Sequence, residues 1–127
     1  MKQLLLIGMA LILSACNTTP SELEDLDKVL RAYEHSMRWS RLELVGQYYK
    51  EPPEFTRADK EHFKNIKVTG YKVLELTATR SEALQLVEIR YYHSDYAVER
   101  EFTDTQKWEY DDKAERWALT SRFPEFK

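Results

Sequence analysis

The chain has 127 residues, a formal net charge of -3 and a single Cys, and 32% of its residues are charged. This length fits one compact domain, and one Cys excludes both an intramolecular disulfide scaffold and a multi-cysteine zinc site. The hydrophobic fraction of 43% is too high for a disordered chain, and the slight acidity gives no indication of a nucleic-acid partner.

The amino terminus has the layout of a secretory signal. Lys2 is followed by an apolar run from Leu4 to Leu13 and then by small residues, which is the pattern of a signal peptide. The run is too short for a membrane-spanning helix, which needs about 20 apolar residues. We therefore expect residues 1–15 to be a signal peptide that is removed.

The end of this segment carries a more specific pattern. Leu13-Ser14-Ala15-Cys16 resembles the lipobox of bacterial lipoprotein precursors. The resemblance implies that the Cys16 sulfur receives a diacylglyceryl group, that the chain is cut before Cys16, and that the new amino terminus is acylated. Two or more acyl chains anchor a protein stably in a membrane.

The residue after the Cys bears on the membrane that is chosen. In lipoproteins of enteric-type bacteria, an Asp at this position favours retention at the inner membrane. Asn17 stands here instead, so the resemblance implies an outer-membrane anchor with the domain facing the periplasm. Residues 16–20 are then the lipidated Cys and a short polar tether.

A single domain is expected over residues 21–127, and it begins with a long helix. Ser21 and Glu24 have the spacing of a capping box. Apolar residues recur at three-and-four spacing from Leu23 to Met37, which predicts a helix from Ser21 to about Met37 with one buried face.

Two shorter helices follow in the sequence. One is expected over residues 41–49, and the pair Pro52-Pro53 ends it because proline disfavours helix on both sides. Thr56 and Asp59 have the spacing of another capping box, which predicts a short helix to about Asn65.

From Ile66 onward the apolar period is that of strands. Gly70 interrupts the first strand and predicts a bulge or bend, and in the second strand the apolar phase slips between Leu86 and Val87, which indicates a bulge or two covered faces. Helices followed by antiparallel strands predict an α+β domain, with the helices packed on a curved four-stranded antiparallel sheet. The four strands are expected over residues 66–79, 83–92, 97–110 and 116–123.

This order of elements is similar to that of the NTF2-like superfamily, a cone-shaped, cystatin-like α+β fold. The resemblance rests on residues 33–39 at the end of the long helix, on the Pro52-Pro53 break, and on the closing strand pair over residues 108–111 and 116–119. The superfamily includes isomerases, hydratase-like enzymes and subunits that only bind, so the fold alone does not define a function.

No residue set predicts a cofactor, a metal site or a catalytic constellation. None of the three histidines, His35, His62 and His93, pairs with another at metal-ligand spacing. His35, near the end of the long helix, is the candidate general base if the cone holds a substrate. The aromatic residues exceed the needs of a small core, and some of them are expected to line a pocket. The candidate pocket residues are Tyr33, His35, Trp39, Tyr71 and Trp108.

The sequence thus predicts a membrane-anchored lipoprotein whose domain binds a protein partner or a small apolar ligand, or supports an envelope assembly. Two alternatives stay open: a small-molecule enzyme that uses the cone cavity, and a structural homodimer formed through the open sheet face. A pocket in which His35 meets a buried carboxylate would favour the enzyme. An interior filled by side chains would count against it.

Overall fold

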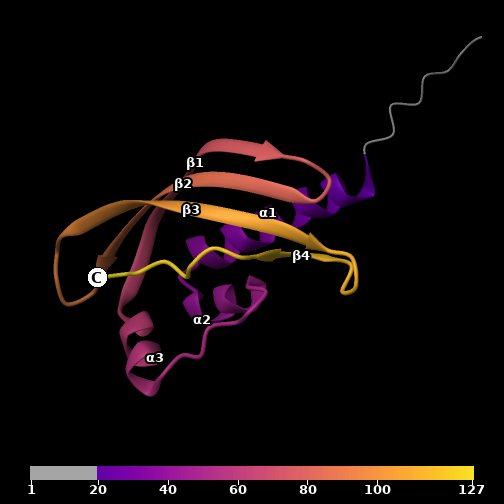
Figure 1. Cartoon of the computed structure of the whole chain (residues 1–127). Coiled ribbons are helices and arrows are strands. Elements are labelled where there is room, and N and C mark those ends of the chain that lie inside the picture. The colour runs from indigo at the N-terminus through magenta and orange to yellow at the C-terminus, as the bar shows by residue number, and fades with distance from the viewer. Residues whose placement is uncertain (1–19) are drawn as a thin grey trace, which may run out of the picture.

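The computed structural model describes residues 20–127, which form three α-helices, one 3-10 helix and a four-stranded antiparallel sheet of order β1-β2-β3-β4 (Figure 1). The predicted α+β class is confirmed. The expected signal peptide and Cys16 lie outside the described residues. The elements are α1 (Ser21–Arg38), α2 (Leu42–Val45), η1 (Gly46–Tyr48), α3 (Arg57–Lys64), β1 (Ile66–Ala78), β2 (Glu82–His93), β3 (Glu99–Asp111) and β4 (Arg116–Leu119).

Helix α1 packs against one face of the sheet (Figure 1). The capping box expected at Ser21 and Glu24 is absent: Pro20 occupies the N-cap position and Ser21 is already helical. The Ser21 hydroxyl instead donates to a carboxylate oxygen of Glu22 over 3.4 Å. No helix within residues 20–127 is long and apolar enough to cross a membrane. The buried face of α1 has the predicted three-and-four spacing and consists of Leu26, Leu30, Tyr33 and Met37.

The two short helical segments differ in how well the sequence predicted them. The capping box of α3 is confirmed, because the Asp59 amide donates to the Thr56 hydroxyl over 3.1 Å and the Thr56 amide donates to the Asp59 carboxylate over 2.8 Å. The helix expected over residues 41–49 is divided into α2 and η1. It tightens at Gly46, which lies so close to Phe55 that a Cβ atom would sit 2.9 Å from the ring.

Strand β1 carries two extra residues relative to β2. The register passes from Val68 opposite Tyr91 to Gly70 opposite Arg90, so one residue, Thr69, is bulged. The bulge predicted at Gly70 is therefore confirmed. A second extra residue, Leu74, comes between the Val73–Val87 and Glu75–Leu86 pairs, and the sequence reasoning missed it.

Strand β2 itself is regular, so the phase slip predicted there is wrong. Leu84 and Leu86 lie on the outer face of the sheet, and the polar residue Gln85 takes the inward position between Ala83 and Val87. Burial alternates without interruption along the strand. The inward residues are Ala83, Gln85, Val87, Ile89 and Tyr91.

Strand β4 is shorter than predicted, and the segment after it covers the edge of β3. The strand ends at Leu119. Beyond it, the Thr120 amide donates to the Lys107 carbonyl over 2.9 Å, and the Lys107 amide donates to the Ser121 hydroxyl over 3.2 Å. Phe126 then packs among the aromatic residues of β2 and β3. This segment therefore shields that side of the sheet.

The free edge of β1 is covered over only half of its length. Near its start, the Val68 amide donates to the Ser40 hydroxyl over 2.9 Å, and the Arg38 guanidinium donates to the Tyr71 carbonyl over 2.7 Å. Every residue from Lys72 to Ala78 is exposed. We call Ile66–Tyr71 the covered half of β1 and Lys72–Ala78 the open half.

Candidate functional site

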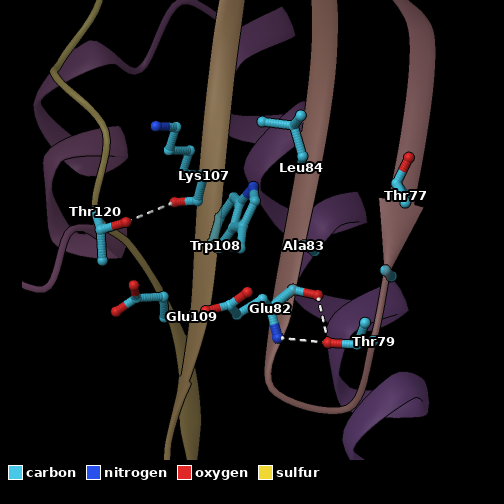
Figure 2. Close-up of a pocket in the computed structure, with 10 residues that line it drawn as sticks. Thr77, Thr79, Glu82, Ala83, Leu84, Lys107, Trp108, Glu109 and Thr120 are labelled. Carbon is cyan, nitrogen blue, oxygen red and sulfur yellow. Dashed lines mark hydrogen bonds between the residues drawn. The ribbon is translucent and has the colours of Figure 1, made fainter.

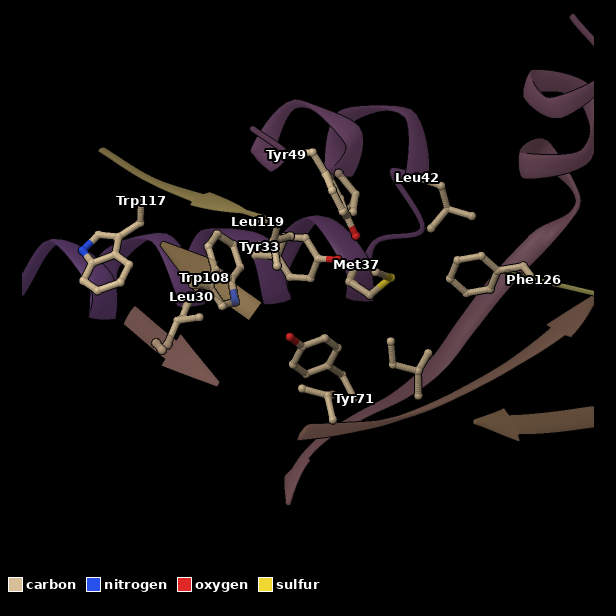
Figure 3. Packing of buried hydrophobic residues seen from close by; sticks show 14 of the residues in the cluster. Leu30, Tyr33, Met37, Leu42, Tyr49, Tyr71, Trp108, Trp117, Leu119 and Phe126 are labelled. Carbon is tan, nitrogen blue, oxygen red and sulfur yellow. The ribbon is translucent and has the colours of Figure 1, made fainter. Parts of the chain in front are cut away.

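A group of polar and aromatic side chains is buried between α1 and the sheet, and we call it the buried polar cluster. Its members come from α1, from the residue after η1, and from β1, β2 and β3, and each is at most 7% exposed. In Figure 3 the Tyr49 and Tyr71 rings point from opposite sides toward Tyr33 and Met37 of α1, and Trp108 lies beside Tyr33. The members are Tyr33, Tyr49, Tyr71, Gln85, Asp104, Gln106 and Trp108.

Strand pairing explains why polar residues enter this interior. In β2 and β3, alternate residues face α1, and opposite residues of the two strands share a face. Gln85 lies opposite Gln106, and Asp104 lies opposite the buried Val87. The three polar residues thus occupy positions where the sheet otherwise carries apolar side chains.

Gln106 is the centre of the hydrogen-bond network. Its amide nitrogen donates to the Tyr71 hydroxyl and to the Asp104 carboxylate, each over 3.1 Å. Its carbonyl oxygen accepts from the Gln85 amide over 3.2 Å and from the Trp108 indole over 3.3 Å. The side chain uses both donors and accepts two bonds, so its orientation is well defined.

Asp104 is a buried carboxyl group. Burial raises its pKa from 3.8 to about 6, and the hydrogen bond from Gln106 offsets only part of this rise. None of the ion pairs within residues 20–127 involves Asp104. The group therefore exchanges a proton close to neutral pH, as the acids and bases of functional sites do.

The three tyrosine hydroxyls of the cluster are neutral at physiological pH. Burial raises the pKa of Tyr33, Tyr49 and Tyr71 above the ordinary value of a phenol, and the nearby Asp104 adds to each rise. The Tyr33 hydroxyl lies beside the Tyr49 hydroxyl, but no hydrogen bond of good geometry joins it to a partner among the described residues. A buried hydroxyl without a partner costs free energy, so the cluster is not fully satisfied.

The interior around the cluster is filled, and hollows open at its margins. Tyr33, Met37 and Gln106 have no exposed surface. An open groove of about 510 Å³ runs between β3 and residues 122–125, and Asp104 forms part of its lining. A second hollow of about 460 Å³ lies at the end of the β1–β2 hairpin, where Trp108 lines it (Figure 2).

The structure separates the five candidate pocket residues into two groups. Tyr33, Tyr71 and Trp108 belong to the buried polar cluster, and the rings of Tyr33 and Trp108 pack edge to face at 5.4 Å. His35 lies on the exposed side of α1, two positions and therefore about 200° around the helix from the buried Tyr33. Trp39 is the first residue after α1 and is 67% exposed. The five therefore do not form one pocket.

The sequence reasoning did not select Tyr49, Gln85, Asp104 or Gln106. A signal for two of them was present in the sequence, because Asp104 and Gln106 have the same strand phase as the aromatic residues Phe102 and Trp108. Polar residues at inward positions predict a buried hydrogen-bonded group. The position of Tyr49 depends on tertiary packing, since it forms an isolated bridge with Leu119.

Together these features define a small α+β protein with an open four-stranded antiparallel sheet and a buried, incompletely satisfied polar cluster. Within residues 20–127, no group of three or more His, Cys, Asp and Glu side chains is arranged to hold a metal ion. No known protein family, curated protein or solved structure matches the chain.

Proposed function

We propose that the protein is a periplasm-facing lipoprotein, anchored in the outer membrane through acyl chains on Cys16, and that its domain is a binding or envelope-assembly module. The apolar run and the small residues before Cys16 support the anchor. Helix α1 on one face of an antiparallel sheet supports an NTF2-like cone as the fold of the domain.

The anchor would hold a particular end of the domain close to the membrane. Only four residues separate Cys16 from Ser21, and an extended chain of this length spans at most about 18 Å. The start of α1 lies beside β4, because the Trp117 indole donates to the Glu22 carbonyl over 2.7 Å. The tip of the β1–β2 hairpin is at the same end, where the Tyr110 amide donates to the Ser81 carbonyl. A partner of this region would therefore be another envelope component.

The observation that carries the binding role is the exposed apolar surface of the open half of β1. Val73, Leu74 and Leu76 are 45%, 48% and 48% exposed, whereas Ile66 and Tyr71 earlier in the same strand are buried. An apolar patch of this kind marks interaction sites in soluble domains. The filled interior around Tyr33 and Gln106 also favours surface binding over a buried ligand.

Two experiments test this proposal in cells. Palmitate labelling should be lost when Cys16 is replaced by Ser, and continued labelling with membrane retention would refute the anchor. A photo-reactive side chain in place of Leu76 should give cross-linked products in the envelope. The same replacement at Leu44, a residue of α2 that is 41% exposed, is the matched control. Equal cross-linking at both positions, or none at either, would refute the binding surface.

Asp104 gives the enzyme alternative one specific support. A carboxyl group whose pKa is about 6 and which lines an open groove is suited to proton transfer. In this alternative, small molecules that bind in the groove would raise the melting temperature of the wild-type protein. Replacement of Arg122, which lines the groove, by Ala should weaken that effect. If no compound raises the melting temperature of the wild-type protein more than that of the Arg122→Ala variant, this support is removed.

A further inference from the structure

The open half of β1 is a free sheet edge: its outward backbone groups are unpaired by another strand, and its side chains are exposed. Along an antiparallel strand, alternate residues direct their N–H and C=O groups to the same edge. The Tyr71 carbonyl reaches Arg38 at the free edge. Val73, two residues later, therefore directs its backbone groups to this edge as well. The extra residue Leu74 shifts the alternation by one position, so beyond it the residues that face the free edge are Leu76 and Ala78.

The inner face of the open half carries apolar side chains, and so does the bulged residue within it. Val73 and Leu76 lie opposite the inward residues Val87 and Gln85, so they share the face that α1 covers elsewhere. Leu74 is the bulged residue between them, and it is 48% exposed. An exposed strand edge with apolar side chains is a template for pairing with another strand.

The opposite side of the sheet does not offer such an edge. The β3 and β4 side is followed by the segment from Thr120 to Phe126, which bonds to Lys107 and packs on the aromatic residues of the sheet. At the outer edge of β4, the Lys50 amide donates to the Leu119 carbonyl over 2.9 Å, and Tyr49 forms a parallel bridge with Leu119. The open half of β1 has no such cover among residues 20–127.

We propose that a second copy of this chain pairs with the open half of β1, antiparallel and about a two-fold axis at Val73. The inference deepens the proposed binding role and rests on the same exposed surface, but it does not need the lipid anchor. The argument is charge complementarity. Lys72 and Glu75 lie on the same outer face, opposite Glu88 and Leu86 of β2. Because Leu74 is an extra residue, a register centred on Val73 sets Lys72 of each copy opposite Glu75 of the other.

The other residues fit this register. Val73 faces its own counterpart on the inner face, Leu74 lies next to the axis, and Tyr71 faces Leu76 of the second copy. The pairing ends at Tyr71, whose carbonyl oxygen accepts a hydrogen bond from Arg38. A carbonyl oxygen has two lone pairs, so it can also accept from the Leu76 amide of the second copy. The result is a continuous eight-stranded sheet with two Lys–Glu pairs across the interface.

The contact is small, so the dimer is weak in dilute solution. A six-residue strand pair buries less than the 1,200 to 2,000 Å² or so of a standard interface. Confinement of both copies to one membrane would raise their effective concentration and favour the same contact without new interactions. The pairing is therefore expected to depend steeply on concentration.

Charge reversal tests self-pairing directly. The protein is residues 17–127, which include every element of the described core, and the measurement is sedimentation equilibrium over rising concentration. K72E or E75K alone should weaken the dimer by roughly 2- to 30-fold, because two attractive cross-strand pairs become repulsive. The K72E/E75K double variant should recover wild-type dimerisation, because both pairs are restored with their signs exchanged.

A second pair of variants separates the contact from general surface effects. Leu74→Glu should abolish dimerisation, whereas Leu44→Glu, at an exposed position on α2, should leave it unchanged. Circular dichroism checks that each variant is folded. A dissociation constant weaker than about 1 mM for the wild type would overturn the proposal, and so would a double variant that stays as weak as the single ones.

The outcomes distinguish this inference from the proposed function. If the chain is monomeric but the photo-reactive side chain at position 76 still gives products of another mass in the envelope, the second copy is refuted and the binding role stands. If dimers form but palmitate labelling does not depend on Cys16, the inference stands and the anchor is refuted.

Discussion

The two halves of β1 have similar side chains and different surroundings. The covered half contains the fully buried Ile66 and the nearly buried Tyr71, whereas Val73 and Leu76 of the open half are about half exposed. The difference comes from what lies against each half: Ile66 and Tyr71 belong to the hydrophobic core, and Arg38 and Ser40 bond to the edge of the covered half. The burial of a strand residue is thus set by what packs on it as much as by its own hydrophobicity.

The largest effect is expected from matched truncations in the two halves. Ile66→Ala should lower the free energy of unfolding by about 2–5 kcal/mol, because it leaves a cavity in a fully buried site. Leu76→Ala should change it by no more than about 0.5 kcal/mol. Urea unfolding of dilute, monomeric protein measures both. Similar losses in the two variants would show that the open half is covered in the monomer.

Burial of Asp104 in the polar cluster lowers the stability of the folded state when its carboxyl group is ionised. Because burial raises the pKa of this carboxyl from 3.8 to about 6, the folded state binds the proton more tightly than the unfolded state does. Stability from this group is therefore present at low pH and is lost as the pH rises from about 4 to 6. Asp104→Asn should remove this loss, so the variant should be more stable than wild type at pH 8 by about 1–3 kcal/mol.

Measurement at low pH is the control for the Asp104→Asn prediction. Near pH 3.5 the wild-type carboxyl is protonated in the folded state and mostly protonated in the unfolded state, so the advantage of the Asn variant should fall to about 0.2 kcal/mol. Thermal unfolding of both proteins from pH 3.5 to pH 8 measures the difference. An advantage that is constant across this range would mean that it does not arise from ionisation.

A smaller effect is expected from the contact that covers the edge of β1. Ser40→Ala removes the acceptor of the Val68 amide and should cost about 1 kcal/mol. Ser40 has a φ of 56°, a left-handed conformation that is unfavourable for residues other than glycine. Ala keeps that strain, so the loss reports the hydrogen bond. Faster exchange of the Val68 amide in the variant would accompany it, and unchanged exchange would contradict this origin.

The smallest effect is expected at the unpaired hydroxyl of the buried polar cluster. Tyr33→Phe should be neutral or should stabilise the domain by up to about 1 kcal/mol, because the lost hydroxyl has no partner. Tyr71→Phe is the control and should cost about 1 kcal/mol, since its hydroxyl accepts from Gln106 and Gln85. Equal losses in urea unfolding would show that the Tyr33 hydroxyl is bonded in solution.

Much of the fold could be predicted because local rules determine it. The three-and-four spacing of Leu26, Leu30, Tyr33 and Met37 predicted α1, and the Thr56–Asp59 spacing predicted the cap of α3. The prediction at Ser21 was wrong because Pro20 takes the N-cap position and shifts Ser21 into the helix. Capping patterns indicate a helix start to within a residue or so.

The site was less predictable because it depends on register and tertiary contacts. The apolar residues Leu84 and Leu86 suggested an inward phase in β2, and the actual inward phase includes Gln85. The candidate pocket combined residues on opposite sides of α1, since His35 is exposed where Tyr33 is buried. The bulge at Leu74 follows from the pairing of β1 with β2, for which the local sequence carries no glycine signal.

Residue-resolved amide hydrogen exchange at low and high protein concentration tests the difference between the halves of β1 most directly. We predict that the Val68 amide exchanges slowly at both concentrations, because Ser40 accepts its hydrogen bond. The Val73 and Leu76 amides should exchange rapidly in dilute protein and slowly in concentrated protein, when a second copy pairs with them. Slow exchange of Val73 and Leu76 in dilute protein would contradict the open edge. Rapid exchange at both concentrations would contradict its pairing with a second copy.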